Sequence, residues 1–309
     1  GTLYYKCIGG ISSMQEMSRR FNDDKVVENL YTFFGDTKRD YLPHGVTENE
    51  FLERLNPEEL EEIQKDIAYT MIRRKTFDYA RVLKKWQIII DATELDEGYQ
   101  KKNDYYLNRC YNRGESNECT KYHRSVLEAK LYLGHHLLCS IATETIQNSE
   151  EYISQSEDKV KQDCESKAFI RLAEKIKKRF PRLPAIITAD GLYVTQRVLQ
   201  ICRNNGWDYI IRYKEGCAAT IEQEYRALPE KEKAGEDIEY QNQIPFGEND
   251  VNLIYYTEKK EQANGKIKVT KFAWITNIEI TKGNARKIVR AGRNRCKIES
   301  MHSIMSTLP

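Results

Sequence analysis

The sequence predicts an α/β protein in which an antiparallel meander of strands is followed by parallel strands, with helices flanking the mixed sheet. Two short runs rich in β-branched residues, Trp86–Asp91 and Ala185–Asp190, are typical of buried strands, and an aspartate ends each run. A third acidic residue, Glu299, follows the basic stretch Arg293–Lys297, which we expect to be helical. The pattern therefore places two aspartates at strand ends and a glutamate on a helix.

Length and composition set wide bounds on the class of protein. The 309 residues suffice for one large domain or two smaller ones. The 49 Lys and Arg nearly balance the 47 Asp and Glu, so the net charge of +2 neither favours nor excludes nucleic acid. No apolar stretch approaches the roughly 20 residues of a membrane span, and no signal-peptide pattern is present. The eight scattered cysteines are typical of reduced thiols in a cytosol.

Residues 1–80 are expected to form a helical region. A short helix is predicted at 14–21, and a longer one begins where Asn56 caps the helix and Pro57 takes the first helical position. Contact with DNA through the basic residues 73–75 is the less favoured alternative to packing on a core. The apolar face expected to pack on that core consists of Leu60, Ile63, Ile67 and Met71.

From Trp86 the pattern changes to strands. A polar segment, Leu95–Arg124, separates the first strand from strands predicted at Val126–Tyr132 and Leu137–Ile146, with Gly134 as the hairpin signal between them.

A polar linker, Gln147–Ser156, then leads to a long amphipathic helix that Pro181 ends. After the strand that ends at Asp190, a helix is expected at Gln196–Asn204 and a further strand at Trp207–Tyr213. The apolar positions of the long helix are Val160, Cys164, Ala168, Leu172, Ile176 and Phe180.

This order of elements (three strands, helix, strand, helix, strand) is that of a ribonuclease H-like core. A right-handed crossover brings the fourth strand beside the first, so Asp91 and Asp190 are expected to emerge side by side. Residues 216–277 are predicted to be a β-containing insertion with a hairpin at Val251–Thr257 and Lys266–Thr276. The expected divisions are 1–80, the helical N-terminal region; 81–215, the first part of the core; 216–277, the insertion; and 278–309, a truncated final core helix that opens at Asn284 and carries Glu299.

Asp91, Asp190 and Glu299 are the candidate catalytic and metal-ligating residues. Carboxylates suit Mg²⁺ or Mn²⁺, because hard cations prefer oxygen ligands. Two such ions about 3.5–4 Å apart activate the attacking oxygen and stabilise the leaving oxygen in phosphoryl transfer. Any one of these acids is more often a helix cap or a solvated residue. Their joint placement favours polynucleotide chemistry.

A basic stripe on the last helix supports that chemistry. Arg295 precedes Glu299 by one helical turn, so both point the same way. A solvated face is the usual fate of such a stripe, but no acidic residues are interleaved with it, which favours contact with phosphates. The stripe consists of Arg286, Arg290, Arg293 and Lys297.

Other site chemistries are less well supported. Cys110, Cys119 and His123, with His135, His136 and Cys139 later, have no spacing typical of a zinc finger. No nucleophile elbow and no glycine-rich phosphate loop is present.

Three blocks of the sequence resemble those of insertion-sequence transposases of the DDE class. Asp91 with Thr93 resembles the first block, an aspartate followed by a small residue and threonine. Residues 189–193 resemble the second, in which an aromatic residue follows the aspartate. Residues 292–299 resemble the third, whose usual form is Gly-Arg-x-Arg-Trp-x-Ile-Glu. The resemblance covers most of residues 50–300 and is closest to the Tyr-Arg-Glu-Lys type of branch, which carries a β-rich insertion before the glutamate.

The resemblance implies a reaction and a set of partners. Asp91, Asp190 and Glu299 would hold two Mg²⁺ ions, with Mn²⁺ as a substitute, and Arg295 would clamp a phosphate. Water would attack double-stranded DNA at the transposon end, and the freed 3′-hydroxyl would attack target DNA. A homodimer on the DNA and a location in the bacterial cytosol, at the nucleoid, are also implied; no membrane is involved.

The third block departs from the family pattern. Cys296 replaces the usual aromatic residue, Gly292 stands in place of a tyrosine, and the expected lysine after Glu299 is missing from a sequence that stops ten residues later. We therefore expect weak activity at most. The alternative function is that of a catalytically inactive transposase remnant that only binds DNA. A host nuclease of the same fold is less favoured, because the third block is of transposase type.

Overall fold

The computed structural model describes residues 2–35, 41–135, 137–154, 161–228, 230–262 and 265–295. It divides into two compact units, one formed by residues up to Leu60 and the other by residues from Glu61 onward. No helix among the described residues is long and apolar enough to cross a lipid bilayer.

The first unit is helical, as predicted. Ser13 and Asp23 cap its second and third helices by accepting hydrogen bonds from backbone N–H groups. A small apolar cluster around Val27, Leu30 and Leu42 holds these helices together. The helices are α1 (Thr2–Ile8), α2 (Met14–Phe21), α3 (Asp24–Phe34) and α4 (Gly45–Arg54).

Helix α5 (Pro57–Arg73) begins where the sequence predicts, because the Asn56 side chain accepts a hydrogen bond of 3.0 Å from the Glu58 N–H. The expected buried face is wrong at three of its four positions; the fourth, Met71, is partly buried and packs on the core. Leu60, Ile63 and Ile67 are 46–57% exposed, whereas Ala68 is fully buried. The side that meets the core is the one that begins with Glu61 and continues through Ala68 and the partly buried Tyr69 and Ile72.

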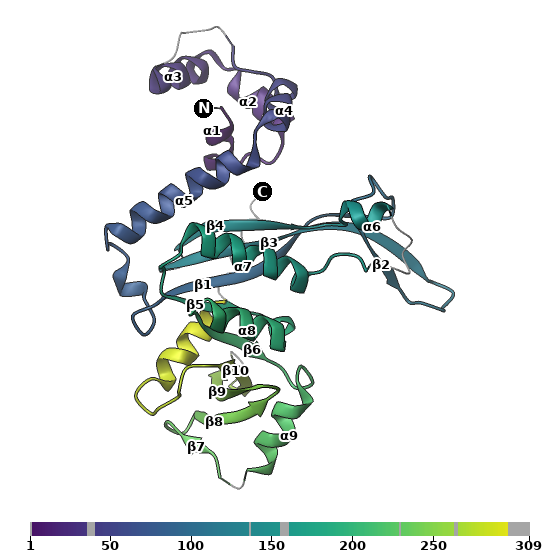
Figure 1. The fold of residues 1–309 in the computed structure, drawn as a ribbon. Helices are drawn as coiled ribbons and strands as arrows, with labels where there is room; N and C mark the ends of the chain where they lie inside the picture. The colour runs from purple at the N-terminus through teal and green to yellow at the C-terminus, as the bar shows by residue number, and fades with distance from the viewer. Residues whose placement is uncertain are drawn as a thin grey trace. The chain divides into compact units, whose positions relative to one another are not determined.

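The second unit is built on a ten-stranded mixed sheet (Figure 1). The strand order is β2-β3-β1-β5-β6-β10-β9-β8-β7, with β4 also paired to β3. The β1–β5 and β5–β6 pairs are parallel and all other pairs are antiparallel. The central order β4-β3-β1-β5-β6 is the one predicted for a ribonuclease H-like core. The strands are β1 (Trp86–Gly98), β2 (Leu107–Tyr111), β3 (Cys119–Gly134), β4 (Leu137–Ile146), β5 (Ala185–Ala189), β6 (Asp208–Tyr213), β7 (Glu232–Lys233), β8 (Ile238–Phe246), β9 (Asn249–Glu261) and β10 (Ile267–Thr276).

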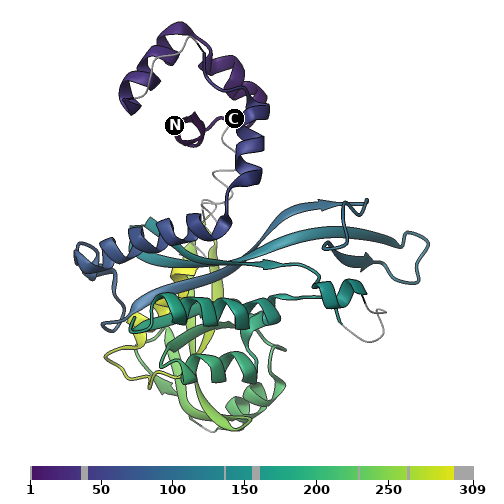
Figure 2. The same cartoon turned by 45° about the horizontal axis from the view of Figure 1, so that its top comes forward.

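The polar segment 95–124 contains more strand than its composition suggests. It includes the end of β1, all of β2 and the start of β3, which form a long arm (Figure 2). The register Leu107↔His123 to Tyr111↔Cys119 pairs the backbone there. Exposed strands can pair through their backbones whatever their side chains are. The polar segment therefore lacks the alternation of apolar residues from which strands are predicted.

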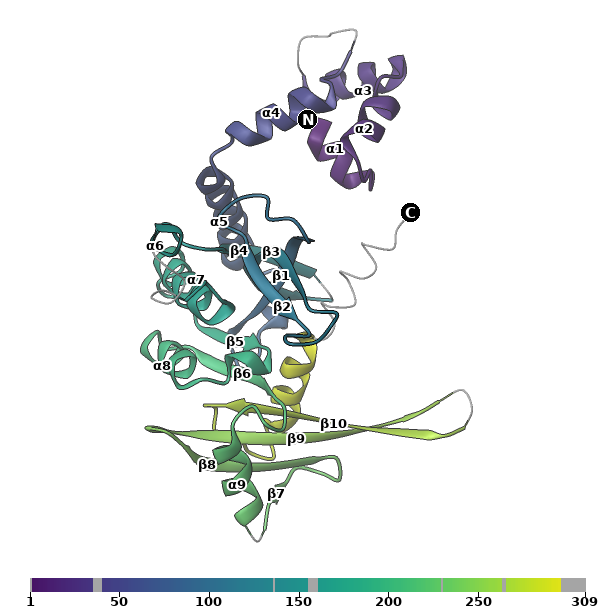
Figure 3. The same ribbon diagram turned by 90° about the vertical axis from the view of Figure 1, so that its right-hand side faces the viewer.

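Helices cover both faces of the central strands. Ile187 and Ile211 face α7 and α8, whereas Ile186 and Ile210 pack with the last helix, residues 285–295. Figure 3 shows α7 and α8 on one side of β5 and β6 and the last helix, in yellow, on the other. The remaining helices are α6 (Glu150–Ser154), α7 (Glu165–Arg179), α8 (Gln196–Asn204) and α9 (Ala219–Ala227), with 3-10 turns η1 (Asp78–Ala80) and η2 (Gly191–Tyr193).

The long amphipathic helix has the predicted core face but begins later. Ala168, Leu172 and Ile176 are buried on α7. Cys164 is its exposed N-cap residue, and Val160 lies outside the described residues.

The region 216–277 continues the same sheet. The predicted hairpin is confirmed as β9 and β10, and β10 pairs antiparallel with β6 through Ile275↔Ile211. Strands β7 and β8 were not predicted from the sequence. The domain boundaries stated above stay a prediction.

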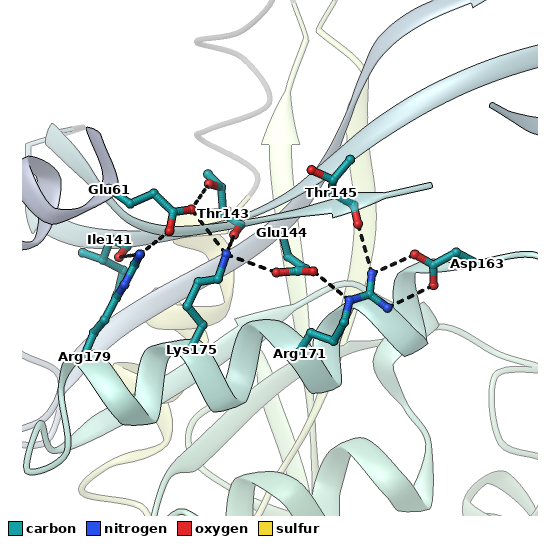
Figure 4. Close-up of polar contacts among 9 residues, drawn as sticks. All are labelled: Glu61, Ile141, Thr143, Glu144, Thr145, Asp163, Arg171, Lys175 and Arg179. Atoms are coloured by element: carbon teal, nitrogen blue, oxygen red, sulfur yellow. Dashed lines mark hydrogen bonds and ion pairs between the residues drawn. The ribbon is translucent and has the colours of Figure 1, made fainter. Parts of the chain in front are cut away.

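Cations on α7 bind the edge strand β4 (Figure 4). Arg171, Lys175 and Arg179 lie four residues apart and so share one side of the helix. Lys175 donates to the Thr143 carbonyl at 2.6 Å, and Arg171 donates to the Thr145 carbonyl at 3.0 Å. Occupied carbonyls on an edge strand cannot accept hydrogen bonds from another chain, so this stripe protects the edge of the sheet.

Glu61 joins α5 to this stripe. Its carboxylate accepts a hydrogen bond of 2.7 Å from the Thr143 hydroxyl, pairs with Lys175 at 3.4 Å and bonds Arg179. Burial acts to raise the pKa of Glu61, but these hydrogen bonds and positive charges outweigh it and lower the pKa below 4.5. The start of α5 is thereby held against the sheet by a charged group.

Candidate active site

The register of the central strands brings Asp91 and Asp190 together. Strands β1 and β5 pair in parallel, and the last pair is Ile89 with Thr188. Two residues further along each strand the side chains return to the same face, so Asp91 and Asp190 are neighbours. Ile186 shares this face and packs against the last helix.

Asp91 does not end its strand, contrary to the sequence prediction. Strand β1 continues to Gly98 and stays paired with β3, where Asp91 lies opposite Glu128. What ends near Asp91 is the parallel pairing with β5, because β5 stops at Ala189. The apolar run 86–90 is the part of β1 that is buried between helices. The rest of the strand, from Asp91 to Gly98, is partly or fully exposed.

A single cation, Arg295, bridges the two aspartates. Its Nη2 atom lies 3.0 Å from Asp91 Oδ1 and 3.4 Å from Asp190 Oδ2. The Arg295 side chain is 11% exposed, and those of Asp91 and Asp190 are 25% and 24% exposed. Two half-buried carboxylates that face one another repel, so a positive charge between them stabilises the pair.

Buried amides fix the last helix over this site. Gln87 donates to the Ala291 carbonyl at 2.7 Å and to the Thr188 hydroxyl at 2.9 Å, and it accepts from the Asn294 amide at 2.9 Å. Gln87 is fully buried in an otherwise apolar run. These bonds join the helix to β1 and β5 next to Arg295, and the sequence signal for them is the lone polar residue inside that run.

Gly292 explains one departure from the transposase pattern. A Cβ atom there would lie 2.4 Å from ring atoms of Trp274 on β10. The indole ring therefore fills the space that a side chain at position 292 would need. The tyrosine of the Tyr-Arg-Glu-Lys signature does not fit here against Trp274, whereas the glycine of the Gly-Arg-x-Arg form does.

The surroundings of Asp190 are tight and basic. Its Oδ1 atom caps η2 by accepting from the Gly191 N–H, and Lys214 Nζ lies 3.8 Å from the same oxygen. A Cβ atom at Gly191 would lie 3.1 Å from the Cys217 sulfur, so the chain turns closely here. Close packing against Cys217 therefore favours glycine at position 191, directly after Asp190.

Tyr193 and Glu165 extend the site and were not predicted as site residues. The buried Tyr193 hydroxyl donates to Glu165 Oε2 at 2.9 Å. Burial, and then the negative charge of Glu165, raise the pKa of Tyr193, and Asp91 adds to the effect. Tyr193 therefore stays a neutral donor beside the carboxylates.

The basic stripe is partly neutralised by residues that are distant in sequence. Arg286 pairs with both oxygens of Asp237, at 2.5 and 2.9 Å. Arg293 lies 3.2 Å from Glu258 and stacks over Phe272. The helix itself carries no interleaved acids, as expected, but region 216–277 supplies them, Asp237 from the turn between β7 and β8 and Glu258 from β9.

Two of the expected site residues, Lys297 and Glu299, lie outside the described residues, as does Cys296. Within the described ranges no group of three or more His, Cys, Asp and Glu side chains is placed to hold a metal ion. The two aspartates nevertheless fit a divalent cation: they offer hard oxygen ligands, and one positive charge already lies between them.

Strand order and paired carboxylates on neighbouring strands are typical of enzymes that transfer phosphoryl groups with the help of divalent metal. Residues 158–308, just under half of the chain, match the family model for the transposase DDE domain. This part of the chain is similar to transposase DDE domains, a family of phosphoryl-transfer enzymes that carry out DNA transposition by strand cleavage and strand transfer with a divalent metal. The match includes Asp190 and Glu299, and Asp91 precedes it. A comparison with curated proteins finds no match.

Proposed function

We propose that this chain is an insertion-sequence transposase of the Tyr-Arg-Glu-Lys type in which Asp91, Asp190 and Glu299 are the catalytic residues. The observation that carries the proposal is the convergence of Asp91 and Asp190 on one cation, Arg295. Two carboxylates this close together offer oxygen ligands from two strands to one divalent cation, and their mutual repulsion favours the binding of a cation between them.

Each residue of the site has a defined task. Asp91, Asp190 and Glu299 hold two Mg²⁺ ions, for which Mn²⁺ substitutes. When bound, the ions activate the attacking oxygen and stabilise the leaving oxygen. Arg295 neutralises the two aspartates in the metal-free chain, and its guanidinium would bind a DNA phosphate if a metal took its place between them. Tyr193, a neutral donor, holds Glu165 away from the pair of aspartates.

The partners follow from the reaction. Double-stranded DNA is bound at the transposon ends and at the target, and two copies of the chain join on it as a homodimer in the cytoplasm. Arg290 and Lys297 contact phosphates directly, whereas Arg286 and Arg293 do so only if DNA competes with Asp237 and Glu258.

Nicking of supercoiled DNA in the presence of Mn²⁺ tests the proposal. We expect slow nicking by this chain and none by Asp91→Asn, Asp190→Asn or Glu299→Gln, with duplex binding preserved in all three variants. Unchanged nicking by any one of these variants would remove that residue from the catalytic set.

A second candidate function is that of an inactive remnant that binds DNA without cleaving it. The observation that favours it is Cys296, which replaces the usual aromatic residue of the third block. This alternative predicts duplex binding with no nicking by the unaltered chain. Cys296→Trp would then leave nicking absent, whereas a weak enzyme would gain activity from the restored aromatic residue.

A further inference from the structure

A large groove runs beside the last helix, away from the carboxylates. Its cavity measures about 1250 Å³, more than the roughly 300–1,000 Å³ of small-molecule pockets. It is lined by the turn around Lys84, by the β3–β4 turn at Gly134, by Tyr256 on β9 and by Lys287 and Arg290 on the helix. Lys287 is eight residues before Arg295, about 12 Å along the helix. The lining reaches Arg293 and Asn294 at its other end, next to Arg295, but does not include Arg295 or the two aspartates.

The groove carries unpaired positive charge. Lys84, Lys287 and Arg290 are exposed, and within the described part of the chain their side chains form no ion pair or hydrogen bond. The one acidic residue of the lining, Glu258, already pairs with Arg293. Three cations that face one hollow without acidic partners create a positive potential there.

Aromatic rings line the same hollow. Tyr79 is 61% exposed, and Tyr132 and Tyr256 are half-buried. The Tyr79 ring rests on Gly134, where a Cβ atom would lie 2.6 Å from it. The glycine therefore lets the ring approach the end of β3 closely, beside the rings of Phe77 and His135, while most of Tyr79 stays exposed.

Strained backbone presents Lys84 to the groove. Leu83 and Lys84 have φ of 50° and 67°, in the left-handed region that residues other than glycine rarely adopt. The two-residue turn is closed by Val82 and Lys85, each of whose N–H groups donates to the other's carbonyl at 2.9 Å. Leu83 packs against the cluster under the last helix and so holds the turn in place. Strain of this kind persists mostly where a site depends on it.

We propose that this groove binds a single-stranded segment of DNA, with phosphates on Lys84, Lys287 and Arg290 and a base stacked on Tyr79. Cations interleaved with aromatic rings are typical of sites that bind unpaired strands, because bases in a duplex present no free face to a ring. The proposal rests on the proposed function as a DNA-processing enzyme, which produces free strand ends.

Fluorescence anisotropy with a labelled oligothymidine of about 16 nucleotides tests the groove. We expect the triple variant Lys84→Gln/Lys287→Gln/Arg290→Gln to bind more weakly and to lower the salt slope by about 2, since each phosphate contact contributes about 0.7. The matched control, Lys178→Gln/Arg182→Gln/Arg197→Gln, removes three exposed cations from the opposite face of the sheet and should bind like the parent chain.

Stacking is tested separately with Tyr79→Leu. It should weaken oligothymidine binding at least about fivefold and leave binding of an abasic strand of equal length unchanged. Equal losses in the two triple variants, or no effect of Tyr79→Leu, would overturn the proposal, and a loss confined to duplex would assign the groove to duplex DNA. Mn²⁺-induced thermal stabilisation should persist in the groove variant, so failure of the metal site and failure of the groove are distinguishable.

Discussion

At the scale of single residues, two polar side chains, Arg295 and Gln87, organise the candidate site. Arg295 lies between two aspartates, and Gln87 ties the helix that carries Arg295 to the strands that carry them. The sequence showed Arg295 as part of a basic stretch but not its partners. Ion pairs between residues some 200 positions apart depend on the fold, which no local pattern records.

Arg295→Gln should raise the affinity for Mn²⁺ by about tenfold, because a cation that competes for the same carboxylate oxygens is removed. The same substitution should lower the melting temperature in the absence of metal, because the aspartates then repel without compensation. Isothermal titration with Mn²⁺ measures the first effect and a thermal melt the second. Arg290→Gln, on the same helix, is the control; a lower affinity in Arg295→Gln would show that Arg295 orients the ligands instead.

Gln87→Leu should cost about 3 kcal/mol of the free energy of unfolding, because it leaves buried groups of Ala291, Thr188 and Asn294 without hydrogen bonds. Urea denaturation measures the loss. Gln200→Leu removes an amide from the exposed side of α8 and should change the free energy by less than about 0.5 kcal/mol. Equal effects of the two substitutions would contradict the role of Gln87.

At the scale of elements, hydrophobic patterning predicted the strands and helices that are buried. It missed exposed strands that are held only by backbone hydrogen bonds. The runs 86–91 and 185–190 were predicted because they are short and rich in β-branched residues, and the helix α8 and the hairpin β9–β10 were predicted as well. The arm built on β2 was missed because it lies largely in solvent. On α5 the apolar residues gave the wrong face, because the polar contacts of Glu61 decide which side meets the sheet.

Glu61→Gln should reduce the free energy of unfolding by about 2 kcal/mol at neutral pH, since hydrogen bonds to a charged group are lost. The folded-state pKa of Glu61 is lowered, so its contribution is present above pH 4.5 and is lost as the pH falls through that lowered pKa. Thermal melts from pH 7 to about pH 3 should therefore show the difference between parent and variant shrinking. Glu62→Gln is the control, because its pair with Lys65 is on the surface; a pH-independent difference for Glu61→Gln would exclude linkage to its ionisation.

At the scale of the whole molecule, the sequence was sufficient for the strand order of the core and for the meeting of Asp91 with Asp190. It did not reveal that region 216–277 extends the same sheet through β10 and β6, because a hairpin pattern does not say which edge it joins. It also did not reveal the acidic partners of Arg286 and Arg293. Both gaps have one cause: long-range pairing is decided by three-dimensional packing.

In the proposed reaction Asp91 and Asp190 bind the same metal ion. Isothermal titration with Mn²⁺ of the parent chain, Asp91→Ala, Asp190→Ala and the double variant measures this directly as a double-mutant cycle. Ligands of one shared site should give nearly the same loss of affinity in either single variant and little further loss in the double variant. Independent losses that add in the double variant would show that the two aspartates bind metal separately, which would contradict the shared site.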